Sequence, residues 1–468
     1  MKVILHGFGS FPVIFWHMIQ CARQMQESVE WAIVLSSDHH YALFADMLGA
    51  DRVIVLDQGG SPPLAGEEDW TYPGALFRDI EAEKRTFKHV SATLQRDRAM
   101  GMYRQIRRFM NRFAPSHALV SQVEGFDGKA FIAAAKEQGA EVVVPTSCRN
   151  LGGTFFSSDD RETLPGYASE KDPEHRRAAE AFIQSFRASS KPARWAPDMS
   201  GDDQLEPFVK PLPARAAAAL RRWVGTPGGF QWDYLRASVL NNVPVIRDIV
   251  WDARRRLNER YCDVRSVDRL PSRFIFYPLQ YSPESSINTP APYFLDQFRA
   301  IDAIRFAMSS DCVLVVKEHP ACILLRNVSF VRRLQRTAGV VVAHYALPSL
   351  ALVKQAGLTI SVTGTAALEA LLLGRRAVTL GGSLVSGFCG GVCPLNSLPK
   401  RIAADFGTEM SYADVVSAVA SLFSIRYDVM FGSPGTSGEP VLRRKNIEGL
   451  THAFFHHIRR SCPGTISS

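Results

Sequence analysis

The amino-acid sequence predicts an α/β protein made of two Rossmann-like, doubly wound parallel-sheet domains with a helical insertion between them. Short apolar segments typical of buried strands alternate with amphipathic helices in two blocks, 1–150 and 273–385. Proline- and glycine-rich segments interrupt this alternation between the blocks. The length of 468 residues exceeds one ordinary core and suits two α/β domains.

The first block contains five segments of strand length separated by helical patterns. The predicted strands are Lys2–His6, Trp31–Ser36, Arg52–Leu56, Ala118–Gln122 and Glu141–Pro145. The predicted helices run from Phe15 to Met25 and over Tyr41–Leu48, Ala92–Phe113 and Gly128–Gln138. Strands alternating with helices of this length indicate a parallel sheet.

The second block repeats this pattern. Its predicted strands are Phe274–Pro278, Cys312–Lys317, Val340–Ala343, Leu358–Val362 and Ala377–Leu380. Its predicted helices are Tyr293–Met308, Val328–Thr337, Pro348–Gln355 and Ala366–Leu373, followed by terminal helices at 411–425 and 443–460. We therefore expect an N-terminal domain at 1–155, a helical insertion at 156–268 with helices at Pro173–Ala188 and Val245–Tyr261, a C-terminal domain at 269–425, and a segment at 426–468 whose helix packs back on the first domain.

Composition narrows the class of protein. The net charge of +8 fits anionic small partners, and the sequence has no zinc-finger, RNA-binding or basic-zipper pattern, so nucleic acid is not an expected partner. The eight cysteines are scattered, which is typical of reduced thiols and gives no metal site. The chain opens directly on a strand and has no apolar stretch of spanning length. We expect a cytoplasmic protein.

The strongest motif follows a predicted strand and opens a helix. It reads Val362-Thr363-Gly364-Thr365-Ala366-Ala367-Leu368-Glu369. Free N–H groups at a helix start and the two threonine hydroxyls favour a phosphate, Gly364 allows close approach, and Glu369 suits ribose hydroxyls. An ordinary capped helix explains the same residues equally well.

Two further strand ends carry polar groups. Lys317, Glu318, His319 and Pro320 end one strand, where an imidazole can bind a phosphate oxygen or pass a proton to a leaving phosphate. The segment Pro278-Leu279-Gln280-Tyr281-Ser282-Pro283-Glu284 ends another. Gln280 suits a base or sugar edge, and Glu284 suits acid or base chemistry, although a solvated proline-rich turn is the plainer interpretation for Glu284.

The first block offers a candidate carboxylate and an arginine. Glu124 follows a strand and precedes a helix, where it can act as an acid or base on an acceptor hydroxyl or simply favour the helix dipole. Arg149 and Asn150 reach the same edge, and Arg149 suits a carboxylate or phosphate. The segment His6-Gly7-Phe8-Gly9-Ser10 lacks the full dinucleotide-binding spacing.

The motifs of the second block together resemble the bacterial capsule polysaccharide synthesis family. The matching segments are Tyr277-Pro278-Leu279-Gln280, Lys317-Glu318-His319-Pro320 and Thr363-Gly364-Thr365-Ala366-Ala367-Leu368-Glu369-Ala370-Leu371. Members include cytoplasmic transferases of Kdo, a sugar acid donated from its CMP derivative. The resemblance implies the two-domain glycosyltransferase B fold, with the donor in the cleft and its phosphate held by the His-Pro pair and the small-residue helix start.

The resemblance therefore predicts a metal-independent glycosyltransferase of surface polysaccharide synthesis. Glu124, Glu284 and His319 are the candidate catalytic residues, and Arg149 and Asn150 would bind the acceptor or the sugar carboxylate. No cofactor is expected, because the nucleotide sugar is a substrate. The alternatives are a CDP-polyol phosphotransferase of teichoic-acid type, a sugar-nucleotide epimerase, and a non-catalytic assembly or export partner.

A basic amphipathic helix adds one further expectation. In the segment 102–113, apolar residues recur at helical spacing and four arginines fill much of the rest. A core-facing helix with a solvated basic face explains this pattern. The sharper hypothesis is peripheral contact with anionic lipid at the inner membrane, where a glycolipid acceptor would be presented.

Overall fold

The computed structural model describes residues 1–57, 59, 62–67, 69–82, 91–123, 125–147, 151–161, 164, 172–189, 244–280, 289–319, 322, 326–434 and 439–461. These residues form two compact units. Unit 1 contains the N-terminal block and the C-terminal segment from Ile425. Unit 2 contains the second block up to Ser424 and a helix that precedes it in the sequence.

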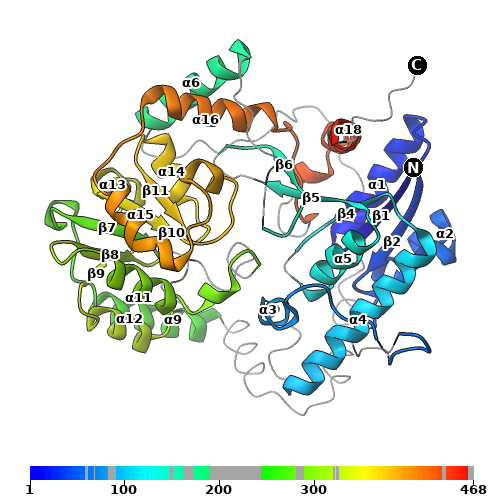
Figure 1. The fold of residues 1–468 in the computed structure, drawn as a ribbon, viewed down its shortest axis with the longest axis horizontal. Coiled ribbons are helices and arrows are strands. Elements are labelled where there is room, and N and C mark those ends of the chain that lie inside the picture. Colours follow the sequence, from blue (N-terminus) through cyan, green and yellow to red (C-terminus); the bar gives the residue numbers. More distant parts are fainter. Residues whose placement is uncertain are drawn as a thin grey trace. The chain divides into compact units, whose positions relative to one another are not determined.

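Unit 1 is built on a six-stranded sheet (Figure 1). Its elements are β1 (Lys2–Gly7), α1 (Phe11–Gln24), β2 (Glu30–Leu35), α2 (Tyr41–Leu48), β3 (Val53–Val55), α3 (Leu76–Ala82), α4 (Ala92–Phe113), β4 (His117–Val120), α5 (Phe126–Glu137), β5 (Glu141–Ser147), β6 (Thr154–Ser157) and α18 (Arg444–Ser461). The strand order is β3-β2-β1-β4-β5-β6, with parallel pairing throughout except between β5 and β6. The five predicted strands are therefore confirmed.

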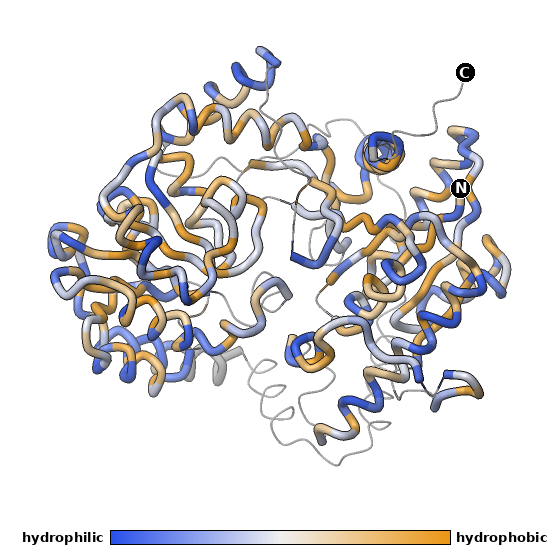
Figure 2. Tube along the Cα trace, viewed as in Figure 1, coloured by the Kyte–Doolittle hydropathy of each residue, from blue (hydrophilic) through white to orange (hydrophobic). Residues whose placement is uncertain are grey.

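Successive residues of β1 point to opposite faces of this sheet, and each face has its own core. Val3 and Leu5 belong to a cluster with α1 and α18, whereas Ile4 belongs to a cluster with α4 and α5. A sheet buried on both faces requires the continuous apolar strands that the sequence contains. Figure 2 shows these strands mostly in orange, while α4 alternates blue and orange.

The C-terminal helix α18 packs in the core of unit 1. It contacts α1, and its Phe454 and Phe455 are fully buried beside Trp31 of β2. Just before it, the chain pairs with β6 through mutual backbone hydrogen bonds of 2.9 Å between Thr154 and Tyr427. The chain therefore returns to its first sheet after completing the second.

Unit 2 repeats the design with five parallel strands. Its elements are α6 (Pro173–Ala188), α9 (Pro244–Glu259), β7 (Phe274–Pro278), α11 (Phe298–Ala307), β8 (Val313–Lys317), α12 (Val328–Gln335), β9 (Val340–Ala343), α13 (Ser349–Gln355), β10 (Leu358–Ser361), α14 (Ala366–Leu372), β11 (Ala377–Thr379), α15 (Leu398–Asp405) and α16 (Tyr412–Ser424). The strand order β11-β10-β7-β8-β9 is the same topology as that of the first five strands of unit 1. These two sheets confirm the predicted two-domain, Rossmann-like fold.

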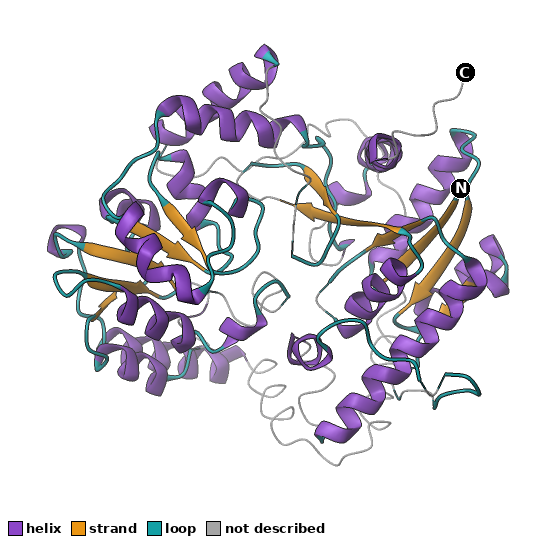
Figure 3. Ribbon diagram, in the orientation of Figure 1, coloured by secondary structure: helices purple, strands orange, loops and turns teal. Residues whose placement is uncertain are grey.

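Two differences from the expected elements have local causes. Strand β6 was not expected, because it follows two glycines in a region interpreted as irregular; it closes the edge of the sheet antiparallel to β5 (Figure 3). The helix expected at Tyr293–Met308 is a short 3-10 turn followed by α11. Asp296 separates them with an extended backbone (ψ 97°), and its side chain accepts the N–H of Phe298 at 3.1 Å.

The described helices of the expected insertion, α6 and α9, both belong to unit 2. Helix α6 packs against α16, with the rings of Phe182 and Phe423 5.6 Å apart. Arg187 near its end donates to the carbonyl of Leu372 at 2.8 Å. Helix α9 packs against α12. The two helices therefore pack against other helices of unit 2.

The apolar side of the basic helix α4 packs in the core of unit 1, as expected for a core-facing helix with a solvated basic face. Ile106, Phe109 and Met110 are buried in the core. Two of its arginines have acidic partners, because Arg107 lies 3.6 Å from Glu137 and Arg108 lies 2.7 Å from Glu67. Contact with a membrane stays a prediction, and half of the basic residues proposed for it are already engaged.

The core position of α18 leads to a stability prediction. Phe454→Ala removes a fully buried ring and should lower the free energy of unfolding by about 3–5 kcal/mol. Phe306→Ala is the matched control, because that ring is 79% exposed and should cost little. Urea unfolding followed by tryptophan fluorescence measures both. A loss below about 1 kcal/mol for Phe454→Ala would show that α18 is not part of this core.

Candidate functional site at the switch point of the second sheet

The order of the strands in unit 2 places the switch point of the sheet at the carboxyl end of β7. The connection from β7 leads to β8 on one side, while β10 lies on the other side. Helix α11 after β7 packs in the core of one face, and α14 after β10 contacts β10 and β11 outside that cluster. Ligands of doubly wound sheets bind where neighbouring connections diverge in this way. Gln280 follows β7 at this point, and the segment Val362–Thr365 follows β10.

Three polar groups join the ends of β7 and β10. The side-chain amide of Gln280 donates to Ser361 Oγ at 3.3 Å, and this oxygen also accepts the N–H of Gly364 at 2.9 Å. Gln297 fixes Gln280 from the other side, since its amide accepts the Gln280 N–H at 2.7 Å and donates to the Gln280 carbonyl at 3.0 Å. A Cβ at Gly364 would lie only 3.0 Å from the Gln280 amide and from Ser361 Oγ. The glycine therefore permits this close packing.

The two threonines flanking Gly364 differ in their surroundings. Thr363 Oγ1 is buried and has no hydrogen-bond partner in the part of the chain that the structure describes. Thr365 is exposed at the start of α14. Buried hydroxyls in folded proteins normally have partners, so the unpartnered Thr363 Oγ1 is a group to which a bound ligand can donate or from which it can accept.

Lys317 and Glu369 are two largely enclosed ionisable groups that lie within electrostatic range of each other. Lys317 is 4% exposed at the end of β8, and its ammonium donates to Ser349 Oγ at 3.0 Å. Burial lowers the pKa of Lys317 to about 8, against the opposing effects of Glu369 and Glu318. Burial raises the pKa of Glu369 to about 7, opposed by Lys317. Both groups can therefore gain or lose a proton near neutral pH, which is typical of functional sites.

Glu318 has a different role from its neighbours. Its carboxylate receives both arms of Arg326, with Nε at 2.6 Å and Nη2 at 3.1 Å. The same guanidinium donates to the Gln280 carbonyl at 3.2 Å. This clamp holds the segments after β7 and β8 together. His319 comes next, with an exposed side chain, and its backbone N–H donates to Glu318 Oε1 at 2.8 Å.

The structure thus brings together Gln280, Lys317, Thr363, Gly364 and Glu369 at one edge of a sheet, with His319 following β8. Ser361, Ser349 and Gln297 complete the set and were not singled out from the sequence. Each is a common polar residue that makes a hydrogen bond to a residue at least 17 positions away, which the sequence pattern does not reveal. The other candidates lie outside the described residues: Glu124, Arg149, Asn150, Glu284 and Pro320.

None of the helices that the structure describes is long and apolar enough to cross a bilayer. Among the described residues, no group of three or more His, Cys, Asp or Glu side chains is placed to hold a metal ion.

No protein-family model matches the sequence, and no curated protein matches it. Solved structures with a similar fold include two from Thermosulfurimonas dismutans KpsC. Its beta Kdo 2,4 transferase is 12% identical, with 72% of this chain and 87% of that chain covered and a TM-score of 0.35. Its beta Kdo 2,7 transferase is 10% identical, with 98% and 100% covered and a TM-score of 0.34. A UDP-GlcNAc 2-epimerase from Methanocaldococcus jannaschii is 11% identical, with 97% and 100% covered and a TM-score of 0.24. Likenesses at this level leave the activity to be argued from the site itself.

The raised pKa of Glu369 leads to a prediction about how the stability of the protein depends on pH. The folded protein keeps a proton on Glu369 up to a pKa of about 7, whereas the ordinary value is 4.5, so the free energy of unfolding should fall as pH rises between these values. Glu369→Gln removes this dependence. The stability of the variant relative to the parent should therefore increase by about 1–3 kcal/mol from pH 5 to pH 7.

Urea unfolding at the two pH values measures the effect. Glu409→Gln is the control, since that carboxylate pairs with Arg375 and is 64% exposed. An equal difference between Glu369→Gln and the parent at both pH values would show that Glu369 is not held in a buried environment.

Proposed function

We propose that this protein is a glycosyltransferase that takes its sugar from a nucleotide, and that the nucleotide binds at the switch point of unit 2. The observation that carries the proposal is the polar edge itself, where Thr363 Oγ1, next to Gly364 in the chain, has no hydrogen-bond partner among the described residues. The ordered motifs that resemble the capsule polysaccharide synthesis family occupy the same edge. The family resemblance and the position of the site therefore support one function.

The site residues fall into groups according to the part of the nucleotide sugar that each would bind. Thr363, Thr365 and His319 offer donors to the phosphate. The Lys317 ammonium, at the carboxyl end of β8, adds a positive charge, and its lowered pKa makes that charge sensitive to pH. Glu369, with a pKa raised to about 7, accepts from ribose hydroxyls when ionised and donates when protonated. Gln280, fixed by Gln297, presents an amide to the base or sugar.

Transfer requires the bond between the anomeric carbon and the donor phosphate to break, with its electron pair leaving on the phosphate. Hydrogen bonds from His319 and the threonines stabilise that charge. An acceptor hydroxyl forms the new bond and gives its proton to a carboxylate, the role that we propose for Glu124 or Glu284. Arg149 and Asn150 would hold the carboxylate of a sugar acid or the acceptor.

The proposed donor is CMP-linked, as with Kdo, and the proposed acceptor is a growing surface glycan or glycolipid. We propose that the protein acts in the cytoplasm without a metal ion. A CDP-polyol phosphotransferase would use the same phosphate-binding residues. It would transfer a polyol phosphate to the acceptor and release CMP. Product analysis separates the two, because only the glycosyltransferase leaves CMP without moving a phosphate to the acceptor.

Binding of a cytidine nucleotide can be tested by the melting temperature of the protein. CMP should raise the melting temperature, because a ligand that binds only the folded protein stabilises it. His319→Ala and Thr365→Ala should each weaken CMP binding by about tenfold, the usual value of one hydrogen bond to a charged group. Thr337→Ala is the control. Thr337 precedes the amino end of β9, whereas the candidate site lies at the carboxyl ends of the strands, and its hydroxyl donates to the Arg333 carbonyl. Parent-like CMP responses in both site variants would refute the phosphate assignment.

The catalytic prediction concerns the two carboxylates of the proposed acid/base step. Glu124→Gln and Glu284→Gln keep side-chain size but remove proton exchange. The variant that replaces the catalytic acid or base should transfer sugar at a rate lower by about two or more orders of magnitude, while its affinity for CMP stays near that of the parent. A radiolabelled-sugar transfer assay measures the rate. Full transfer in both variants would exclude both residues from the acid/base role.

A further inference from the structure

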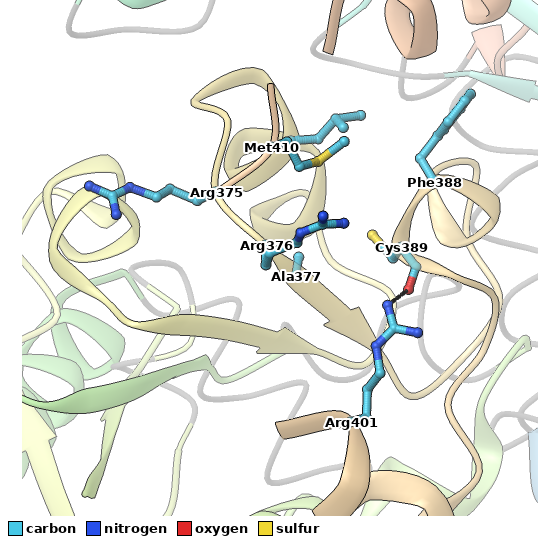
Figure 4. A pocket seen from close by; sticks show the side chains of 8 residues that line it. Arg375, Arg376, Ala377, Phe388, Cys389, Arg401 and Met410 are labelled. Atoms are coloured by element: carbon cyan, nitrogen blue, oxygen red, sulfur yellow. Dashed lines mark hydrogen bonds between the residues drawn. The ribbon is translucent and has the colours of Figure 1, made fainter. Parts of the chain in front are cut away.

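Some arginines of unit 2 are held by a fixed partner. Arg375 lies 2.9 Å from Glu409. Arg401 donates to the Cys389 carbonyl at 2.6 Å, beside a hollow with room for about one water molecule (Figure 4). These guanidiniums are therefore already engaged within the protein. Helix α12 differs, because it presents a group of exposed arginines without acidic partners.

The arginines of α12 form an uncompensated positive group. Arg332 and Arg333 of the helix and Arg336 directly after it are exposed. None of the three forms an ion pair with a residue in the described part of the chain. The sequence has no acidic residue between Glu318 and Glu369, so the helix and the segments on either side of it contain only basic charges. This surface therefore favours an anionic partner.

The apolar sides of α11 and α12 are used in the core of unit 2. The two helices lie side by side on one face of the sheet, where Val331 and Leu334 of α12 share a buried cluster with Ile301 of α11 (Figure 1). The rings of Phe298 and Phe330 join the helices with centres 4.9 Å apart. The opposite side of α12, which carries the arginines, is therefore left for solvent or a partner.

An exposed aromatic ring adjoins this positive group. Phe306, near the end of α11, is 79% exposed. The guanidinium carbon of Arg305 lies 4.4 Å from the centre of this ring, and the same side chain donates to the Ala338 carbonyl at 3.1 Å. Ala338 is two positions after Arg336, so Arg305 links the ring to the end of the arginine group. The charge of Arg305 itself is balanced by Asp302 at 2.9 Å.

We propose that Arg332, Arg333, Arg336 and Phe306 form a surface that docks on an anionic lipid membrane. The arginines complement the phosphates of the lipid headgroups, and a phenylalanine ring can enter the apolar side of the interface. A second copy of this chain is a poor occupant, because a two-fold contact here would place the arginines against each other. The proposal puts membrane contact on unit 2 instead of on α4, where two arginines already have acidic partners. It does not rest on the proposed function.

Flotation with lipid vesicles tests this surface. The parent protein should bind vesicles of phosphatidylcholine mixed with phosphatidylglycerol but not phosphatidylcholine alone, and added salt should weaken the binding. The double variant Arg332→Gln, Arg336→Gln should bind the mixed vesicles at least about tenfold more weakly, because each arginine near an anionic surface contributes about fivefold. The double variant Arg104→Gln, Arg112→Gln on α4 removes the same charge from unit 1. It is the matched control and should change the affinity less than about twofold.

Phe306→Ala provides a readout that does not depend on charge. It should weaken binding to the mixed vesicles at least about threefold, since an apolar ring is no longer buried in the interface, and it should leave the salt dependence unchanged. The double variant on α12 and Phe306→Ala should both keep the melting temperature and the CMP response of the parent. Those two measurements separate failure of this surface from failure of the nucleotide site.

Four results would overturn the proposal. They are no binding of the parent to the mixed vesicles, equal binding to both kinds of vesicle, parent-like binding of the double variant on α12, and loss of binding only in the double variant on α4. Tight binding of duplex DNA at the same salt concentration, lost in the double variant on α12, would also overturn it, because the surface would then recognise nucleic acid.

Discussion

The parallel pairing of β7 on both of its edges is the constraint on which the candidate site depends. The register sets Pro278 beside Lys317 of β8 and Phe276 beside Thr359 of β10. One further bond, from the Leu279 N–H to the Lys317 carbonyl at 2.8 Å, continues the pairing past the end of the strand. Residues from segments more than 80 positions apart therefore meet at one edge. A shift of one residue would turn every side chain to the other face and separate them.

Burial at this edge then determines the chemistry. Lys317 and Glu369 lose solvent and shift their pKa values toward each other, to about 8 and about 7. Glu318, equally buried, is instead neutralised by both arms of Arg326. Burying a charge costs free energy, and apolar residues of similar size would often make the folded protein as stable or more stable. The Glu318–Arg326 ion pair holds the segments after β7 and β8 together. Lys317 at the end of β8 and Glu369 on α14 instead have pKa values near neutrality, and we therefore propose them for the nucleotide site.

The sequence predicted the parts of the fold that local patterns determine. All ten parallel strands of the described residues could be located, because strands buried on both faces are continuous apolar runs, such as Val313–Val316 of β8. Strand β6 could not, since its pairing depends on β5 and on Tyr427, far away in the sequence. Gln280 and Thr363 could be singled out because they follow strands. Ser361, Ser349 and Gln297 could not, because their importance lies in hydrogen bonds that only the folded sheet creates.

We propose that a nucleotide binds at the carboxyl ends of β7, β8 and β10. Hydrogen–deuterium exchange with and without CMP tests this most directly, because bound ligand slows local opening of the backbone. We expect slower exchange in the segments 277–280, 317–319 and 361–369, with little change in the strands of unit 1. Binding of CMP that protects only unit 1, or that leaves these three segments unchanged, would contradict it.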